Sequence, residues 1–186
     1  MKTVLILGAT NPVTHQVANN LKQQGISVVI YNEDPKSIAK YQAVLTTHEI
    51  TTVLCTYGPM DVDWYVESFY EALRLNHQSI DHFILLSVIG VNNEQEEPLQ
   101  YEGVTDQREY LLQQQYAIKV VDEAEMPYTI IRQSRVVIGA PKPYQLYLEG
   151  QVMPVGTVTD GTVAAICTDA ILHHHYVNES IGIMNN

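Results

Sequence analysis

Short apolar runs alternate along the chain with longer stretches in which apolar side chains recur every three or four positions. A run of about five apolar residues is typical of a strand buried on both faces, and the wider spacing is typical of a helix with one face on a core. Strands are predicted at residues 3–7, 27–31, 52–56, 82–87 and 128–132. Helices are predicted from Val13 to before Gly25, at 62–76, at 106–124 and at 160–176, the last with Asp160 or Thr162 as its cap.

Strands that alternate with helices predict a parallel sheet covered by helices on both faces, an α/β Rossmann-like three-layer sandwich. We expect one domain over residues 1–186, because the length suits a single core and no linker divides it. Between Pro35 and Val53 the chain is short. It has room for one helix at about 35–41 and at most one short strand at about 43–45, so we expect this edge of the sheet to be shortened near the third strand.

Charge and composition exclude some functions. The net charge of −11 offers no basic face, so nucleic-acid binding is not expected, and any anionic ligand must rely on local backbone donors. No apolar run is long enough to span a membrane, and the first one is too short for a signal peptide. We therefore expect a cytoplasmic protein without a membrane partner. Cys55 and Cys167 lie far apart in apolar surroundings, which predicts buried core thiols.

Five stretches in order along the chain resemble one family. They are "TVLILGAT", "TVLCTYGP", "FILLSVIGV", "MPYTIIRQSRVV" and "GTVTDGTVAAICTDAI". Together they are similar to the NmrA-like, atypical short-chain dehydrogenase family of NAD(P)H-binding proteins. The resemblance implies an NAD(P)H-dependent oxidoreductase that acts on a small molecule, with a substrate-side segment at about 133–154.

The resemblance also places the cofactor contacts. In the family, a turn with three glycines follows the first strand: one for the tight turn, one for close approach of the pyrophosphate and one for helix packing. Here Gly8 keeps the first position, while Asn11 and Thr14 occupy the others and Pro12 removes a backbone donor. Two interpretations of this turn stay open: it binds a dinucleotide weakly, or it connects the strand to the helix and binds no ligand. The implied contacts in this turn and in the loop after the third strand are Gly8, Thr10, Asn11, Pro12, Val13, Thr56, Tyr57 and Gly58.

The end of the second strand bears on cofactor choice. By the family pattern, Asn32 lies where an acidic residue often binds the adenosine ribose, and Glu33 lies where NADP-binding members tend to carry Arg. A carboxylate there opposes a 2′-phosphate, so the expected preference is NAD(H) over NADP(H).

The catalytic residues of the family match only in part. The resemblance places Ser87 at the substrate carbonyl and Tyr110 at the position of the proton donor. Gln114 stands where the family has the Lys that lowers the tyrosine pKa, and a neutral side chain does not act in this way. A Tyr116–Lys119 pair has the wrong separation by one residue. The alternative function is a catalytically silent member that senses nucleotide or binds a protein partner.

Three remaining features have plain interpretations. Residues 173–175 are three histidines at the end of a predicted helix. Adjacent side chains on a helix point in different directions, so these three are not expected to chelate one metal together. The acidic stretch 92–103 lies where the resemblance implies a loop over the active site, and it is predicted to be a mobile, solvated loop, with a role as a lid as the less favoured alternative. Tyr144 and Tyr147 suit equally the wall of a small-molecule pocket or a homodimer contact.

Overall fold

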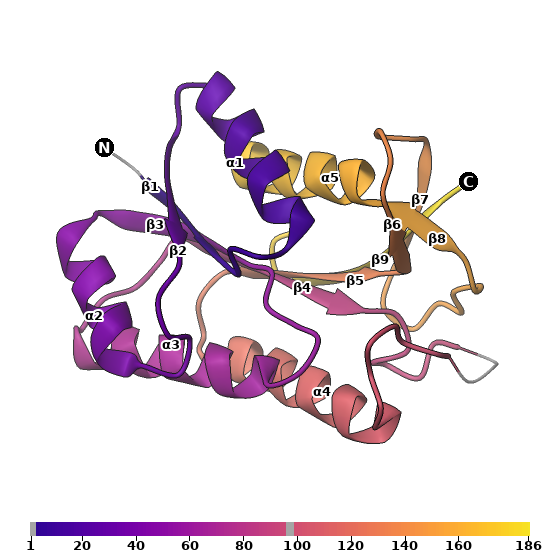
Figure 1. The fold of residues 1–186 in the computed structure, drawn as a ribbon, viewed down its shortest axis with the longest axis horizontal. Helices are drawn as coiled ribbons and strands as arrows, with labels where there is room; N and C mark the ends of the chain where they lie inside the picture. Colours follow the sequence, from indigo (N-terminus) through magenta and orange to yellow (C-terminus); the bar gives the residue numbers. More distant parts are fainter. Residues whose placement is uncertain (1–2, 96–98) are drawn as a thin grey trace.

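A computed structural model describes residues 3–95 and 99–186. Seven strands form one sheet in the order β2-β1-β3-β4-β5-β9-β7, parallel except that β7 runs antiparallel to β9 (Figure 1). The strands of this sheet are β1 (Thr3–Leu7), β2 (Ser27–Tyr31), β3 (Ile50–Cys55), β4 (His82–Val88), β5 (Tyr128–Gln133), β7 (Tyr144–Tyr147) and β9 (Glu179–Asn185). A small second sheet pairs β6 (Arg135–Val137) with β8 (Thr157–Thr159).

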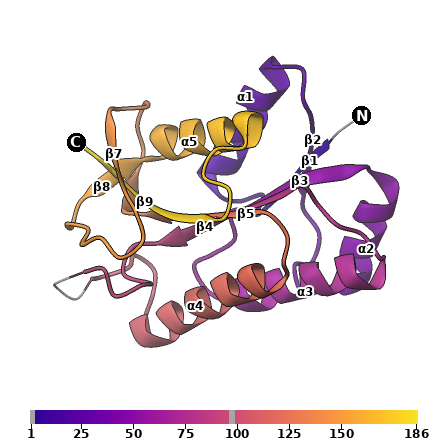
Figure 2. The same ribbon diagram turned by 180° about the vertical axis from the view of Figure 1, so that it is seen from behind.

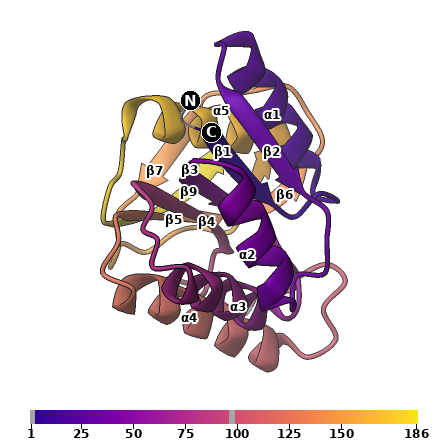
Figure 3. The same cartoon turned by 90° about the vertical axis from the view of Figure 1, so that its left-hand side faces the viewer.

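Five helices cover the two faces of the large sheet. They are α1 (Pro12–Gln23), α2 (Ile38–Thr47), α3 (Val62–Leu75), α4 (Gln107–Glu123) and α5 (Asp160–His173). Helices α1 and α5 lie on one face, and α2, α3 and α4 lie on the other (Figures 1 and 2). The end-on view in Figure 3 shows the three layers. The predicted α/β Rossmann-like sandwich is therefore confirmed, and among the described residues no helix has the length and apolar character needed to cross a membrane.

Each face has its own apolar core. Leu5, Val53 and Phe83 point toward α2–α4, while Ile6, Leu54 and Ile84, their neighbours along the same strands, point toward α1 and α5. This alternation explains why the strands read as continuous apolar runs. Both cysteines are fully buried, as predicted, and burial raises the pKa of the Cys55 thiol to about 12.

The region before β3 corrects one prediction and confirms another. Residues 43–45 are not a strand, because they lie inside α2, which extends to Thr47. Tyr41 and Leu45 are buried one turn apart on the core side of this helix, and Ser37 caps its first turn. Strand β2 is the edge of the sheet, so the expected shortening at this edge is confirmed.

The C-terminal part differs from the prediction at both ends of α5. The N-cap is Thr159, whose side chain accepts a hydrogen bond from the backbone N–H of Thr162, so neither proposed cap was correct. The helix ends at His173, three residues early, because His174 adopts a left-handed conformation with φ of 52°. Strand β9 then enters the sheet between β5 and β7, and neither β7 nor β9 was predicted.

This early end also corrects the prediction for the histidines. With His174 turning the chain, His173 and His175 come together, their ring centroids 5.4 Å apart, and both contact Asp169. The argument from helical geometry failed because only His173 is helical.

Candidate functional site

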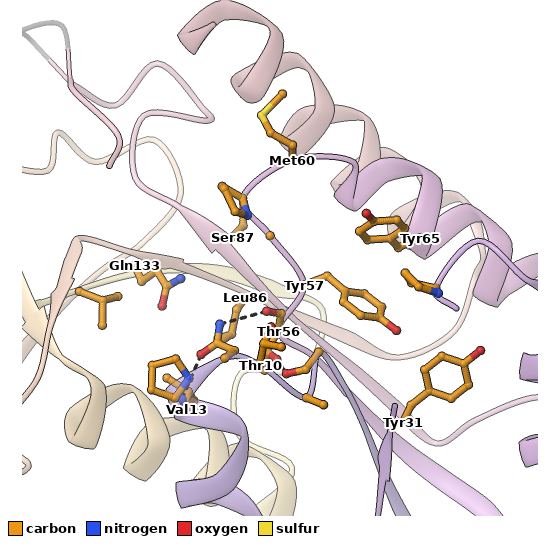
Figure 4. A pocket seen from close by; sticks show the side chains of 18 of the residues that line it. Thr10, Val13, Tyr31, Thr56, Tyr57, Met60, Tyr65, Leu86, Ser87 and Gln133 are labelled. Atoms are coloured by element: carbon orange, nitrogen blue, oxygen red, sulfur yellow. Dashed lines mark hydrogen bonds between the residues drawn. The ribbon is translucent and has the colours of Figure 1, made fainter. Parts of the chain in front are cut away.

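A cavity of about 590 Å³ lies at the carboxyl ends of β1, β3 and β4, where the following loops meet (Figure 4). All twelve residues selected from the sequence line it: Gly8, Thr10, Asn11, Pro12, Val13, Asn32, Glu33, Thr56, Tyr57, Gly58, Ser87 and Tyr110. Sequence reasoning missed other lining residues, and of these Tyr31, Tyr65, Met60 and Gln133 are labelled in Figure 4. Such clefts at the carboxyl edge of a parallel sheet are where α/β proteins bind ligands.

Gly8 brings the first turn against the loop after β3. Its φ is 103°, and a Cβ atom built on it would lie 2.4 Å from the hydroxyl oxygen of Thr56. Any other residue would therefore be both strained and in collision. The glycine is required by the contact between two loops, whether or not a ligand is present.

Asn11 uses its side chain to close this turn. Its Oδ1 accepts a hydrogen bond from the backbone N–H of Val13 at 3.0 Å, and its Nδ2 donates to the carbonyl oxygen of Thr56 at 3.0 Å, as the dashed lines in Figure 4 show. Its extended backbone, with φ −74° and ψ 130°, is the one expected before Pro12. Because Pro12 has no N–H, the start of α1 offers fewer donors to a phosphate than a glycine turn does.

Thr14 has a structural use of its own. Its hydroxyl donates to the carbonyl oxygen of Gly8 at 2.7 Å and lies 2.8 Å from the hydroxyl of Thr56, with all three groups buried. The third glycine of the family turn is thus replaced by a hydrogen-bonded threonine that still lets helix α1 pack on the sheet.

The far end of the cavity lies beside the edge strand β2. Asn32 and Glu33 line it together with aromatic side chains, among them Tyr57 and Tyr65, which contact each other with ring centroids 5.0 Å apart. Glu33 Oε2 lies 3.2 Å from Lys40 Nζ, and both side chains are more than half exposed. Part of the negative charge of Glu33 is therefore offset by a neighbour from α2.

The other end brings together Ser87, Tyr110 and Gln114. The Ser87 hydroxyl donates to Gln114 Oε1 at 2.9 Å, so the side chain in place of the family's Lys holds the serine. Burial raises the pKa of Tyr110 to about 12, and its ring packs edge-on against Tyr101. The Tyr110 phenol is therefore protonated at neutral pH and not activated. Tyr116, the alternative tyrosine, is exposed and does not line this cavity.

A second cavity, of about 620 Å³, adjoins the first. Tyr110, Gln133 and Val136 line both cavities, and the other residues that line the second are 88–89, 99–102, 134–135 and 155–157. Within the described parts of the chain, Gln133 Oε1 and the Ser134 hydroxyl are buried without a hydrogen-bond partner. No pattern in the sequence marks these two residues, because their position beside the cavities arises only when β5 passes into β6.

The segment 133–154 contributes fewer residues to the walls of the two cavities than the resemblance implied. Its first residues line the cavities, but Tyr144 and Tyr147 do not line either of the two. Tyr147 is buried in a small apolar cluster, and its carbonyl oxygen accepts a hydrogen bond from Arg132. Tyr144 is exposed, and its use in a homodimer stays a prediction.

The acidic stretch is not simply a solvated loop. Glu94 is buried and accepts a hydrogen bond at 2.7 Å from Arg132, a fully buried residue of β5. Its other oxygen accepts from the backbone N–H of Asn92. The prediction was wrong at this position because the required cation lies far along the chain, and residues 96–98 are outside the described part.

The comparisons with known proteins agree with this geometry. The sequence profile of the NAD(P)H-binding family matches residues 15–174, which is most of the chain. The chain belongs to the NAD(P)H-binding family. The match begins just after the altered turn, and among curated proteins none matches the chain in sequence.

Several solved structures share the fold at low identity. A Rossmann-fold NAD(P)-binding family protein from Shigella flexneri is 21% identical with a TM-score of 0.78, covering 100% of this chain and 94% of that one. A short-chain dehydrogenase/reductase from Veillonella parvula, solved with NADP, is 18% identical with a TM-score of 0.76, covering 99% and 94%. ChuY, an anaerobillin reductase from Escherichia coli O157:H7, is 13% identical with a TM-score of 0.78, covering 98% and 97%.

Proposed function

We propose that this member of the NAD(P)H-binding family is an oxidoreductase of the atypical, NmrA-like short-chain dehydrogenase type. It binds NAD(H) in preference to NADP(H) in the first cavity and reduces a small molecule in the second. The observation that carries the proposal is the junction of the two cavities at Tyr110, Gln133 and Val136. Hydride transfer needs direct contact between a cofactor and a substrate, and two adjoining cavities provide it.

The residues present fit a dinucleotide whose diphosphate is held by fewer donors than usual. The first cavity runs from Asn32 and Glu33, past the start of α1, to Ser87. The Val13 N–H already donates to Asn11, so it is not free to bond the diphosphate. The partial positive charge at the start of α1 still attracts the diphosphate. This arrangement supports weak rather than tight binding.

The chemistry at the junction differs from the tyrosine–lysine scheme. When bound, a reduced dinucleotide supplies a hydride, a proton with two electrons, to a carbonyl carbon and is thereby oxidised. Ser87 and Tyr110 line the first cavity where we place the reacting carbonyl, and the Ser87 hydroxyl is bonded to Gln114. Since burial raises the pKa of Tyr110 and Gln114 stands in place of the activating Lys, this phenol is a weaker proton donor than the tyrosine of the tyrosine–lysine scheme.

The proposed preference for NAD(H) rests on Glu33. A 2′-phosphate near this carboxylate is repelled by about 1 to 2 kcal/mol, and pairing with Lys40 reduces the effect. We expect NADH to bind about tenfold more tightly than NADPH at low salt. The Veillonella parvula protein, which shares the fold at 18% identity, was solved in complex with NADP.

Calorimetric titration of the purified protein with NADH and NADPH at low salt tests the proposal. Glu33→Arg is expected to remove or reverse the preference. Glu123→Arg, at an exposed residue of α4, changes the net charge equally and is expected to leave it unchanged. Tighter binding of NADPH by the unchanged protein would contradict the preference, and binding of neither cofactor would contradict the proposed reaction.

A second candidate is a catalytically silent nucleotide sensor, and one observation favours it. The hydrogen bonds of Asn11 satisfy the turn without any phosphate, so the fold does not need a cofactor to complete it. Oxidation of bound NADH by a panel of carbonyl compounds separates the two functions. Cofactor binding without turnover on any member of the panel supports the sensor.

A further inference from the structure

Three side chains that suit a transition metal meet at the C-terminal end of α5. Asp169 Oδ1 lies 2.9 Å from His173 Nδ1, and Asp169 Oδ2 lies 2.5 Å from His175 Nδ1. One ligand atom from each residue lies within 4.8 Å of the other two. All three side chains are about half exposed, so hydrated ions reach them freely.

The backbone explains why these residues converge. Asp169 and His173 are four residues apart on α5 and therefore share one face of the helix. The left-handed His174 then reverses the chain, which stacks the ring of His175 on that of His173. The ring of His174 itself lies on the other side, 5.6 Å from the ring of His82.

We propose that Asp169, His173 and His175 bind one divalent first-row transition-metal ion, with Zn²⁺ as the reference ion. Two imidazoles and one carboxylate are a common ligand set for such ions. In the absence of metal, the imidazole N–H protons fill the space between each ring and the carboxylate, and the metal replaces them. Water completes the coordination, since the three side chains are open to solvent.

The surroundings favour a cation. Zinc bonds of about 2.0–2.2 Å place the ligand atoms about 3.4 Å apart. The two hydrogen-bonded pairs, now at 2.9 and 2.5 Å, must therefore open by less than about 1 Å, which is a small shift for exposed side chains. The helix C-terminus carries partial negative charge, and the chain as a whole has a net charge of −11. Neither feature opposes binding, and both raise the local cation concentration.

The position points to a structural role. Residues 174–178 connect α5 to β9, whose first residue pairs with Thr129 near the start of β5. This is the amino-terminal edge of the parallel strands, opposite the two cavities. A metal bridging the last turn of α5 and His175 would hold this connection, and with it the entry of β9 into the sheet.

The experiment is a zinc titration by calorimetry, with chain that carries no affinity tag. We expect one saturable site per chain with micromolar or tighter affinity, and zinc is expected to raise the thermal midpoint of unfolding. His173→Ala and His175→Ala should each weaken the site at least about tenfold, because each removes one of three protein ligands. Cobalt provides a second readout, through the visible absorption that nitrogen ligands produce.

The matched control is His174→Asn, which removes the adjacent imidazole and keeps a residue that tolerates the left-handed backbone. Zinc affinity should be unchanged in this variant. Circular dichroism of each variant checks the fold before titration. Absence of a saturable site in the unchanged chain, or equal loss of affinity in His174→Asn and His173→Ala, overturns the proposal.

Discussion

Asn11 shows how one residue can complete a turn and weaken a site at the same time. It replaces a glycine of the family turn and bonds both the start of α1 and the loop after β3. The carbonyl of Thr56 and the N–H of Val13 are thereby satisfied within the protein. A bound diphosphate therefore has one hydrogen-bond donor fewer at the start of α1.

Replacement of Asn11 by Gly is expected to tighten NADH binding about tenfold, or about 1.4 kcal/mol. The change frees the Val13 N–H to bond the diphosphate, and it lets the backbone of the turn come closer to the diphosphate. Stability should fall by about 1 kcal/mol, because Gly is an acceptable N-cap but the hydrogen bond from Asn11 to the Thr56 carbonyl is lost. Calorimetric titration measures the affinity, and urea unfolding measures the stability.

Asn11→Asp is the matched control for this prediction. Its carboxylate keeps the Val13 N–H occupied and adds a negative charge, so NADH should bind more weakly than to the unchanged protein. Equal affinity in the Gly variant and the unchanged protein would show that the capped turn is not what limits binding. Thr14 is left in place, since its hydroxyl is part of a buried hydrogen-bonded group.

At the scale of elements, a buried ion pair joins the loop after β4 to the interior of the sheet. Arg132 of β5 is fully buried and contacts Glu94, Ser180 of β9 and the carbonyl of Tyr147 in β7. The backbone carbonyl of Glu94 also accepts from the N–H of Met153. The loop that carries residues 99–102 into the second cavity is thus anchored at its start.

Glu94→Ala is expected to lower the free energy of unfolding by about 3 to 5 kcal/mol, because it leaves the Arg132 charge buried without a carboxylate. Urea unfolding followed by circular dichroism measures this loss. Glu123→Ala, which removes an exposed partner of Lys119, should cost less than about 1 kcal/mol.

A double variant sharpens the test of this pair. Glu94→Leu combined with Arg132→Met removes both charges, and it should recover much of the stability lost in Glu94→Ala. If Glu94→Ala were as stable as Glu123→Ala, the carboxylate would not be the anchor of the loop.

On the scale of the whole molecule, the carboxyl ends and the amino ends of the parallel strands differ in structure. The carboxyl edge is opened by loops that form two adjoining cavities, while the amino edge is closed by hydrogen bonds. There the Thr129 hydroxyl donates to the carbonyl of Tyr176 at 2.8 Å, so its oxygen accepts from His82 Nε2 at the same distance. His82 Nδ1 is then unprotonated, and within the described residues it is buried without a partner.

This arrangement makes the stability of the whole protein depend on pH. Burial, with a smaller contribution from His174, lowers the pKa of His82 from 6.5 to about 4. The unfolded chain therefore binds a proton more readily than the folded one. The contribution of neutral His82 to the free energy of unfolding is fully present above about pH 6.5 and is lost as the pH falls toward about 4.

We expect the free energy of unfolding to fall by up to about 1.4 kcal/mol per pH unit between about pH 6 and about pH 5. Urea unfolding with a chelator present measures this slope. His82→Gln cannot take up the proton and should show a shallower slope over the same range. Parallel slopes in the two proteins would exclude His82 as the cause.

Several features follow from the sequence alone. The β1–β5 strands, the buried cysteines and the α/β class depend on apolar runs and helical spacing, which each segment carries within itself. The twelve site residues, chosen through the family resemblance, also line one cavity, and most of them lie in the loops that follow parallel strands. Their roles toward a cofactor stay predictions.

Other features were decided only in three dimensions. Glu94 meets Arg132 across 38 residues, and Gln133 faces two cavities because of how β5 continues into β6. Strand β9 is recognisable only by its place between β5 and β7, and His175 joins His173 only because the helix stops between them. The local sequence pattern indicates how deeply a segment is buried. Contacts between distant residues depend on strand register and on where the chain reverses, and no single segment determines these.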